Sequence, residues 1–152
     1  MIRTLAAVLT AAVFLLALPA TGQAQQAEDI GDYRVHYSAM NTNMLPTDVA
    51  RAYGIQRSSN RALINLAVLR KAGSEDELDT PTRARIDVSA RNLTGQPRPI
   101  GLQEIQEENA IYYIGTFRIT NEETLTFDVE VRPEGMTGPA ETFSFQQKFY
   151  TD

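Results

Sequence analysis

The 152-residue sequence contains no cysteine, no tryptophan and a single histidine. Without cysteine it can form no disulfide bond, no thiolate metal site, no lipid-modified cysteine anchor and no cysteine nucleophile. The one histidine, His36, falls on the polar side of an alternating segment, which is typical of a solvated strand residue rather than of a catalytic triad or a metal site. The sequence therefore predicts no catalytic residue, no metal ion and no cofactor.

The acidic side chains form no recognisable catalytic or calcium-binding motif. Residues 75–79 are rich in carboxylates but lack the residue order of an EF-hand loop, so we expect a solvated acidic loop there. Glu107–Glu108 and Glu122–Glu123 are adjacent pairs, and neighbours on a strand point to opposite faces, whereas a glycosidase needs two carboxylates across a cleft. We expect a protein that is not an enzyme. A carboxylate-based enzyme or enzyme accessory is the alternative.

The net charge of −5 at pH 7 disfavours binding to nucleic acids and to anionic membrane surfaces. This charge is unevenly distributed along the chain. Residues 51–98 contain nine basic and five acidic residues, whereas residues 99–152 contain three basic and ten acidic ones. The two regions can lie side by side and neutralise each other, or the basic region can form a patch for a small anionic ligand.

The N-terminus has the three parts of a secretory signal peptide. Arg3 supplies the positive start, residues 5–18 are almost entirely apolar but too few to span a bilayer, and residues 22–24 resemble an A-x-A cleavage site. We expect residues 1–24 to be removed after Ala24 and residues 25–152 to form one domain in the periplasm, without membrane insertion. An exported domain without disulfides fits a bacterial periplasm better than the outside of an animal cell.

The clearest structural pattern lies between Ile111 and Arg132. Residues 124–131 alternate strictly between polar and apolar side chains, which is typical of a strand with one buried and one exposed face. Residues 111–114 are apolar on both faces, so we expect their strand to be central or covered. The polar segment between the two predicts a tight turn, in which Asn121 can take positive φ, so we expect the two strands to form a β-hairpin.

Alternating or apolar segments bounded by turn residues predict five further strands, at residues 32–40, 61–70, 83–93, about 100–105 and 140–150. Pro97 and Pro99 are expected to hold the chain at a sheet edge, because proline donates no ladder hydrogen bond. Residues 25–30 are expected to be a flexible start and residues 71–82 an exposed, mobile loop.

One short helix is expected over Pro46–Tyr53, where Gly54 ends it. It is too short to be stable alone, so Val49 and Tyr53 must pack on a sheet. The strand predicted at residues 61–70 is apolar on both faces except at Asn65, and the helix can cover its second face. A helical conformation of residues 61–70 is the alternative on periodicity alone.

These elements predict a mainly β fold: a seven-stranded antiparallel β-sandwich of immunoglobulin-like topology with one short helix. A β-barrel is the alternative, and a single helix disfavours a parallel α/β fold. Gln147 shares a phase with the phenylalanines of the last strand, which predicts a β-bulge or a buried, hydrogen-bonded amide. In the core we expect Phe127 and Val129 to face residues of the other sheet, namely Ile64, Leu66 and Val88.

The most distinctive polar cluster is Arg57-Ser58-Ser59-Asn60-Arg61, at the junction of a loop and a strand. Sandwich domains often bind ligands through loops, and arginine binds anions through charge-assisted hydrogen bonds. We therefore take Arg57, Asn60 and Arg61 as candidate binding residues. The alternative is a structural role, in which Arg61 pairs with a carboxylate of the acidic C-terminal region and stabilises the fold.

Four blocks of the sequence resemble one family. They are GDYRVHYSAMNTNMLPTDVARAYGIQRSSNRALINLAVL, NLTGQ, AIYYIGTFRITNEETLTFDVEVRPEG and FQQKFYTD. In these blocks and their order the chain is similar to the bacterial exported proteins grouped as domain of unknown function 4426 (DUF4426). The resemblance implies export in proteobacteria and one compact domain. It carries no assigned activity and no catalytic residues.

The function expected from these observations is that of a non-catalytic binding or interaction module in the periplasm. Its partner would be a periplasmic protein or a small anionic ligand. An envelope assembly factor that pairs through an exposed strand edge is a further alternative.

Overall fold

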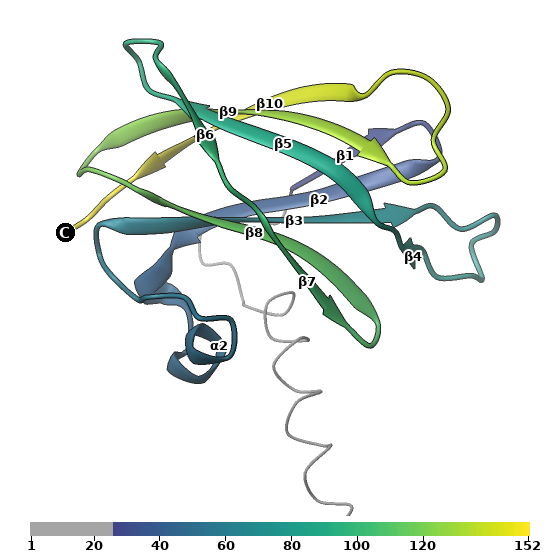
Figure 1. The fold of residues 1–152 in the computed structure, drawn as a ribbon, viewed down its shortest axis with the longest axis horizontal. Helices are drawn as coiled ribbons and strands as arrows, with labels where there is room; N and C mark the ends of the chain where they lie inside the picture. The colour runs from purple at the N-terminus through teal and green to yellow at the C-terminus, as the bar shows by residue number, and fades with distance from the viewer. Residues whose placement is uncertain (1–25) are drawn as a thin grey trace, which may run out of the picture.

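Two antiparallel β-sheets pack face to face in the computed structural model, which describes residues 26–152 (Figure 1). The first sheet has the order β1-β2-β3-β8-β7, with the short β4 paired to β3, and the second has the order β10-β9-β5-β6. The bounds are β1 Gln26–Ile30, β2 Tyr33–Asn41, β3 Arg61–Arg70, β4 Thr80–Pro81, β5 Ala84–Arg91, β6 Pro97–Ile100, β7 Gln103–Glu107, β8 Ala110–Arg118, β9 Glu123–Pro133 and β10 Glu141–Phe149. The signal peptide predicted for residues 1–24 lies outside the described residues.

The predicted mainly β, antiparallel sandwich with one short helix is confirmed, with more strands than the seven expected. Residues 25–30 were expected to be flexible, but the structure has the strand β1 there. Its last residue, Ile30, is buried, and its register with β2 is continuous. The single strand expected near residues 100–105 is two strands, β6 and β7, which belong to different sheets. The predicted edge position of Pro97 and Pro99 is confirmed, since β6 is the outer strand of its sheet.

The core between the sheets is centred on Phe127 of β9. Its ring stacks on Phe145 at 4.8 Å between centroids and meets Phe117 edge-on at 5.4 Å. Leu125, Phe127, Val129 and Val131 are all at most 1% exposed, so the strict alternation predicted for this strand is confirmed. Ile64 and Leu66 do come from the other sheet and belong to the same core.

One predicted core contact is wrong. Val88 does not face Val129 from the other sheet but lies directly opposite it within the second sheet, where β5 pairs with β9. The alternation of β5 correctly placed Val88 in the core, because alternation shows which face of a strand is buried. It does not show which strand is the neighbour, and this pairing joins segments about forty residues apart.

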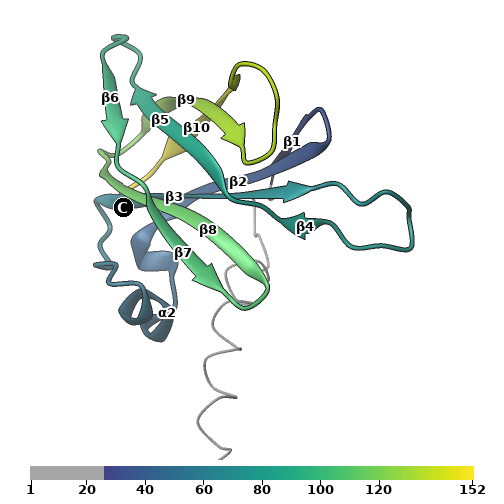
Figure 2. The same cartoon turned by 45° about the vertical axis from the view of Figure 1, so that its right-hand side comes forward.

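A second, smaller core lies on the outer face of the first sheet. The α-helix α2, Thr47–Ala52, and the 3-10 turn η1, Thr42–Met44, lie on the side of this sheet that faces away from the second sheet (Figure 2). The buried residues there are Leu45, Val49, Ala50, Leu63, Tyr112 and Ile114. The predicted helix and its cover of the second face of residues 61–70 are therefore confirmed. No helix of the described residues is long and apolar enough to cross a membrane.

The predicted hairpin is wrong, because β8 and β9 belong to different sheets and do not pair. The turn between them also differs from the prediction. Glu122, not Asn121, takes positive φ, at 57°. The side chain of Asn121 instead holds the end of the chain, donating to Asp152 Oδ2 (3.0 Å) and accepting from the Thr151 N–H (3.1 Å). Of the two alternatives for Gln147, the bonded amide is confirmed. Its Nε2 donates to the carbonyl of Ala39 (2.8 Å), and the β9–β10 register runs without a bulge.

The chain passes from the second sheet to the first over Gly115 of β8. In Figure 1 it runs from β6 in the upper layer across β8 to β7 in the lower layer. A Cβ on Gly115 would lie 2.6 Å from the carbonyl oxygen of Gly101 and 2.6 Å from Cγ2 of Ile100. Glycine is therefore required here for close approach of two backbones and not for a special φ.

We expect Gly115→Ala to lower the free energy of unfolding by about 1–3 kcal/mol, because the added methyl overlaps a backbone atom that cannot rotate away. Urea unfolding followed by far-UV circular dichroism measures the change. Gly73→Ala is the matched control, since a Cβ at Gly73 meets nothing within 4 Å. Equal effects of the two substitutions would contradict the crossing as a steric constraint.

Candidate functional site

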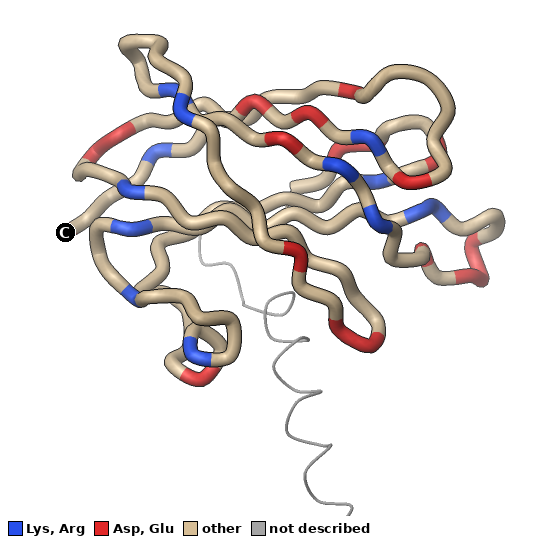
Figure 3. The backbone as a smooth tube through the Cα atoms, in the orientation of Figure 1, with Lys and Arg blue, Asp and Glu red and all other residues tan. Residues whose placement is uncertain are grey.

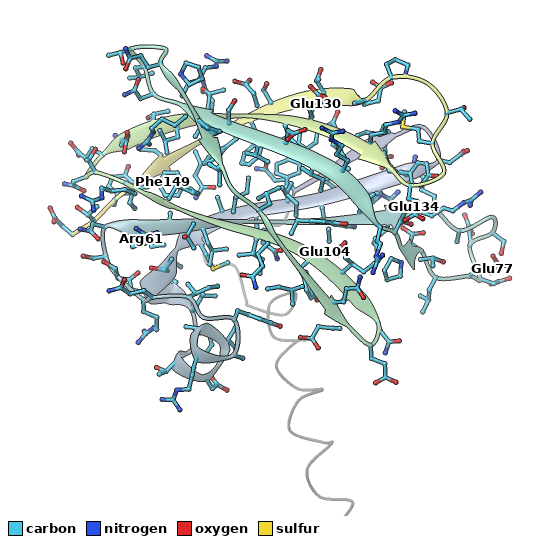
Figure 4. The ribbon with its side chains drawn as sticks, viewed as in Figure 1. Arg61, Glu77, Glu104, Glu130, Glu134 and Phe149 are labelled. Atoms are coloured by element: carbon cyan, nitrogen blue, oxygen red, sulfur yellow. The ribbon has the colours of Figure 1, made fainter. Side chains whose placement is uncertain are left out.

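A groove at one end of the sandwich is lined by three arginines, Arg83, Arg85 and Arg132. It has a volume of about 430 Å³, and Glu104, Glu134 and Met136 complete its walls. Figure 3 shows basic positions gathered where β5 begins and β9 ends, and Figure 4 shows Glu134 at this end of the molecule and Arg61 at the other. We call this hollow the arginine groove. Its three arginines and two glutamates leave one excess positive charge.

Strand register places two of the guanidinium groups side by side. Arg85 of β5 lies directly opposite Arg132 of β9, so both side chains leave the same outer face of the second sheet. Like charges at directly opposed positions destabilise a sheet. The carboxylate nearest to Arg85 is that of Asp87, at 3.9 Å, and both side chains are largely exposed, so this pair compensates little of the repulsion. An anion lying across both guanidinium groups would remove it.

A buried tyrosine fixes the acidic wall of the arginine groove. The hydroxyl of Tyr113 accepts a hydrogen bond from the Ala84 N–H (2.9 Å) and donates one to Glu104 Oε1 (2.9 Å). Burial, the largest cause, raises the pKa of Tyr113, so the hydroxyl keeps its proton at neutral pH. Glu104 is also 3.7 Å from Nε of Arg83. This carboxylate is therefore held by two partners.

We expect Tyr113→Phe to lower the free energy of unfolding by about 1–3 kcal/mol, because the Ala84 N–H loses its acceptor where the sheets meet. Thermal unfolding at constant pH measures the loss. Tyr150→Phe is the control, since Tyr150 is 54% exposed. An equal midpoint for the two variants would show that the Tyr113 hydroxyl does not hold this end of the sandwich.

The candidate residues Arg57 and Asn60 lie in the loop that follows α2. Arg57 donates to the carbonyl of Asn43 (2.8 Å) and to the hydroxyl of Thr47 (3.3 Å). The amide oxygen of Asn60 accepts a hydrogen bond from the Ser58 hydroxyl (2.6 Å). The bonds of Arg57 hold the loop against η1 and α2, and the Ser58–Asn60 bond lies within the loop. A ligand-binding role of Arg57, Asn60 and Arg61 stays a prediction.

Arg61 does not form the ion pair expected of it. Its guanidinium donates to the hydroxyl of Thr116 on β8 (3.0 Å), and no carboxylate of residues 26–152 lies within ion-pair distance of it. In strand register Arg61 lies directly opposite Arg118. A second pair of opposed arginines therefore lies at the end of the molecule away from the arginine groove. The acidic residues of the C-terminal half lie elsewhere, and the expected neutralisation does not occur at Arg61.

Thr42 is the buried residue that organises this loop. It is fully buried, and its hydroxyl accepts from the Ser58 N–H (2.8 Å) and lies 3.1 Å from the carbonyl oxygens of Ser58 and Arg61. Sequence reasoning did not select it, because a threonine before a helix is an ordinary capping residue in the sequence. Its actual partners are sixteen and nineteen residues away.

Replacing Thr42 by valine keeps the shape and removes the hydroxyl. We expect Thr42→Val to lower the free energy of unfolding by about 1–3 kcal/mol and to speed amide hydrogen exchange at Ser58, which loses its acceptor. Thr137→Val, at an exposed position of the β9–β10 loop, is the control. Unchanged exchange at Ser58 would contradict the role assigned to the Thr42 hydroxyl.

A second hollow, which we call the α2 groove, lies on the outer face of the first sheet beside α2. It has a volume of about 410 Å³. Its apolar walls come from the end of α2, the β6–β7 connection and the two strands that follow, namely Tyr53, Ile55, Leu102, Ile105 and Ile114. Tyr53 donates its hydroxyl proton to Glu107 Oε1 (3.2 Å), and burial followed by the charge of Glu107 raises the pKa of Tyr53. The tyrosine therefore stays neutral.

Catalytic and metal-binding groups are not gathered in either groove. Within residues 26–152 no three His, Cys, Asp or Glu side chains come close enough together to hold a metal ion. His36 lies on β2, as its alternation predicted. The nearest approach to a polar active-site cluster is the pair of Glu104 and Tyr113, and both of these groups are engaged in the contacts described above.

The arginine groove was not predicted from the sequence. The pattern places Arg83 and Arg85 on the polar side of the predicted strand but does not show that Arg132, near the end of β9, lies opposite Arg85. The available signal was the spacing of two arginines by one residue just after Pro81. Such spacing is common on solvated strands, so it does not distinguish a groove from an ordinary surface.

The family described as "Domain of unknown function (DUF4426)" matches residues 27–152. Among solved structures, a DUF4426 family protein of Pseudomonas aeruginosa PAO1 is similar at 35% identity with a TM-score of 0.69. The match covers 84% of this chain and 96% of that chain. No curated protein matches the chain.

FetP of uropathogenic Escherichia coli strain F11, recombinantly expressed in the periplasm, has a similar structure at 10% identity and a TM-score of 0.58. The match covers 84% of this chain and 95% of that chain. A copper-bound variant of FetP, with one glutamate replaced by glutamine, matches over the same shares at 10% identity and a TM-score of 0.57. At this identity the likeness concerns the fold alone.

Proposed function

Since this chain belongs to the DUF4426 family, whose description assigns no activity, we propose a function from its own geometry: it is a periplasmic, non-catalytic module that binds a small anion in the arginine groove. One observation carries the proposal. Arg85 and Arg132 stand directly opposite each other and both line a hollow of about 430 Å³, where the exposed carboxylate of Asp87, 3.9 Å from Arg85, compensates their charge only weakly. The guanidinium groups of Arg85 and Arg132 are the donors that would bind an anion.

The chemistry of the groove favours a phosphate or a carboxylate. Each guanidinium presents planar N–H donors that match two oxygens of such an anion, and two guanidinium groups can bind opposite sides of it. The glutamates of the groove do not compete for Arg85. Glu104 lies beside Arg83 and accepts from Tyr113, and among the described residues the ion pair of Arg85 is with Asp87, not with either glutamate. The polar wall is thus formed before a ligand arrives.

A binding role fits the groove better than a catalytic role. A general base needs a carboxylate or imidazole that can accept a proton from the substrate, and a tuned pKa. Glu104 accepts a hydrogen bond from Tyr113 and lies 3.7 Å from Nε of Arg83, so it is already engaged by two neighbours. A carboxylate-based enzyme is therefore the weaker proposal.

The periplasmic location rests on the pattern of residues 1–24 and on the absence of cysteine. FetP, which has a similar fold, was expressed in the periplasm, and this agrees with the proposal without testing it. We also propose that the sandwich has the immunoglobulin-like topology expected from the sequence. Its support is the antiparallel sandwich with strands that alternate in burial.

Titration with inorganic phosphate and with malonate, followed by amide NMR, tests the site. We expect shifts at Gly135 and Met136, and weakening of binding by about tenfold in Arg85→Gln and in Arg132→Gln, since each loses a charge-assisted hydrogen bond. Arg91→Gln is the matched control. It lies on the same strand and face but pairs with Asp128 at 2.9 Å.

Added salt should weaken binding of both anions, because the guanidinium groups are exposed. If Arg91→Gln weakens binding as much as Arg85→Gln, the effect is one of net charge and the proposed site is wrong. The site is also wrong if neither anion shifts the amides of the β9–β10 loop while all variants remain folded.

A further inference from the structure

On one side the described part of the sandwich ends in two outer strands that do not pair with each other, β1 of the first sheet and β10 of the second. β10 packs on β2, since the ring of Phe145 lies 4.4 Å from the ring of Tyr37. Its neighbour β9 lies farther in, where Phe127 meets Phe117 of β8. The outer side of β10 therefore points in the same direction as β1, which flanks β2 on its outer side.

β10 is suited to pair with a further strand. The other three strands at the ends of the two described sheets are protected: β6 contains two prolines, and β1 and β7 have five residues each, two of them acidic. Proline, charge and shortness all oppose pairing at a sheet edge. β10 has nine residues and no proline, and residues 142–147 carry no charge. An added strand is therefore expected at β10 rather than at the other edges.

The inner face at this open side is aromatic and carries one carboxylate. Phe143 and Phe145 of β10 and Tyr37 of β2 are only half-buried and pack together. Glu28 of β1 lies opposite the buried Val35, so its side chain points to the same inner face. Burial and then the charge of Glu28 raise the pKa of Tyr37. Glu28 itself is exposed and has no ion pair within residues 26–152.

We propose that an extended segment of another protein binds here as an additional strand, with its backbone hydrogen-bonded to β10 and a lysine or arginine side chain at Glu28. In strand addition the main chain supplies affinity, and alternate side chains supply specificity. On the inner face, apolar side chains of the segment cover Phe143 and Phe145. The partner segment therefore has apolar and basic residues on one face. The proposal does not depend on the proposed function, because no residue of β1 or β10 lines the arginine groove.

A second copy of this chain fits the open side less well. Two copies paired through β10 keep their inner faces on the same side, because directly opposed residues share a face. Lys148, the only basic residue of β10, is exposed and alternates with the buried Phe149, so it points to the outer face. The inner face of β10 thus brings no cation to Glu28. A small cation could bind Glu28, but it would leave the edge of β10 unextended.

Two seven-residue peptides with blocked ends test the proposal on the chain without residues 1–24. The lysine peptide is Thr-Val-Thr-Lys-Thr-Val-Thr, whose valines and lysine share one face, and the glutamate peptide has glutamate in place of lysine. Amide NMR locates binding, and isothermal titration gives dissociation constants. We expect shifts and slower amide exchange in β10. We expect the lysine peptide to bind about tenfold more tightly than the glutamate peptide, because its charge is opposite to that of Glu28.

A third peptide tests the backbone pairing. It is the lysine peptide with proline at its second and fifth residues, so that both of its edges lack N–H groups. We expect it to bind at least about tenfold more weakly than the lysine peptide, because it cannot complete a ladder with β10.

A charge reversal on β1 tests the role of Glu28. Glu28→Lys should reverse the order of the lysine and glutamate peptides, since a cation then stands at the open side. Glu75→Lys is the matched control, because it makes the same change in the exposed loop between β3 and β4 and should leave the order as it was. Arg85→Gln should leave peptide binding intact, so this proposal and the proposed function can fail separately. Far-UV circular dichroism checks that the variants fold.

The proposal is overturned if neither peptide shifts the amides of β10, or if the proline-containing peptide binds as tightly as the lysine peptide. It is also overturned if Glu28→Lys and Glu75→Lys bind the two peptides in the same order. A dimer of the chain alone in which the amides of β10 are protected would overturn it as well, since a second copy would then occupy this edge.

Discussion

The close passage of the chain over Gly115 is the constraint on which both grooves depend. Because no side chain stands at this point, the β6–β7 connection can cross directly from one sheet to the other, with the Gly101 carbonyl against β8. The four residues from Gly101 to Glu104 then serve both hollows. Leu102 and Gln103 line the α2 groove, and Glu104 reaches the arginine groove. The lack of a side chain at Gly115 therefore sets the position of both grooves.

Tyrosine hydroxyls connect the apolar interior to the polar ends of the molecule. Tyr113 joins β5 to β7 through its two hydrogen bonds, Tyr33 reaches the carbonyl of Glu134, and Tyr53 reaches Glu107. Each ring contributes apolar area to a core while its hydroxyl satisfies a group at the boundary with water. In a chain without disulfides these contacts link strands that are not neighbours in sequence.

Strand positions could be predicted from the sequence because burial follows a period of two, as residues 124–131 and 84–91 show. The pairing of strands could not, because alternation does not identify neighbours. Val88 was therefore assigned to the wrong sheet, and the juxtaposition of Arg85 and Arg132 was not foreseen. The cluster around Arg57 was recognisable, but its hydrogen bonds to η1 and α2 depend on a loop path that local pattern does not determine.

The prolines of β6 have a consequence for how molecules of this kind can associate. Pro97 and Pro99 occupy alternate positions of the outer strand, so one edge of the second sheet lacks N–H groups that an added strand would need. The opposite edge, β10, has nine residues and no proline. Open-ended stacking requires two competent edges on every subunit. The second sheet can thus be extended from one side only, which permits a closed pair through β10 but no open-ended fibre built through this sheet.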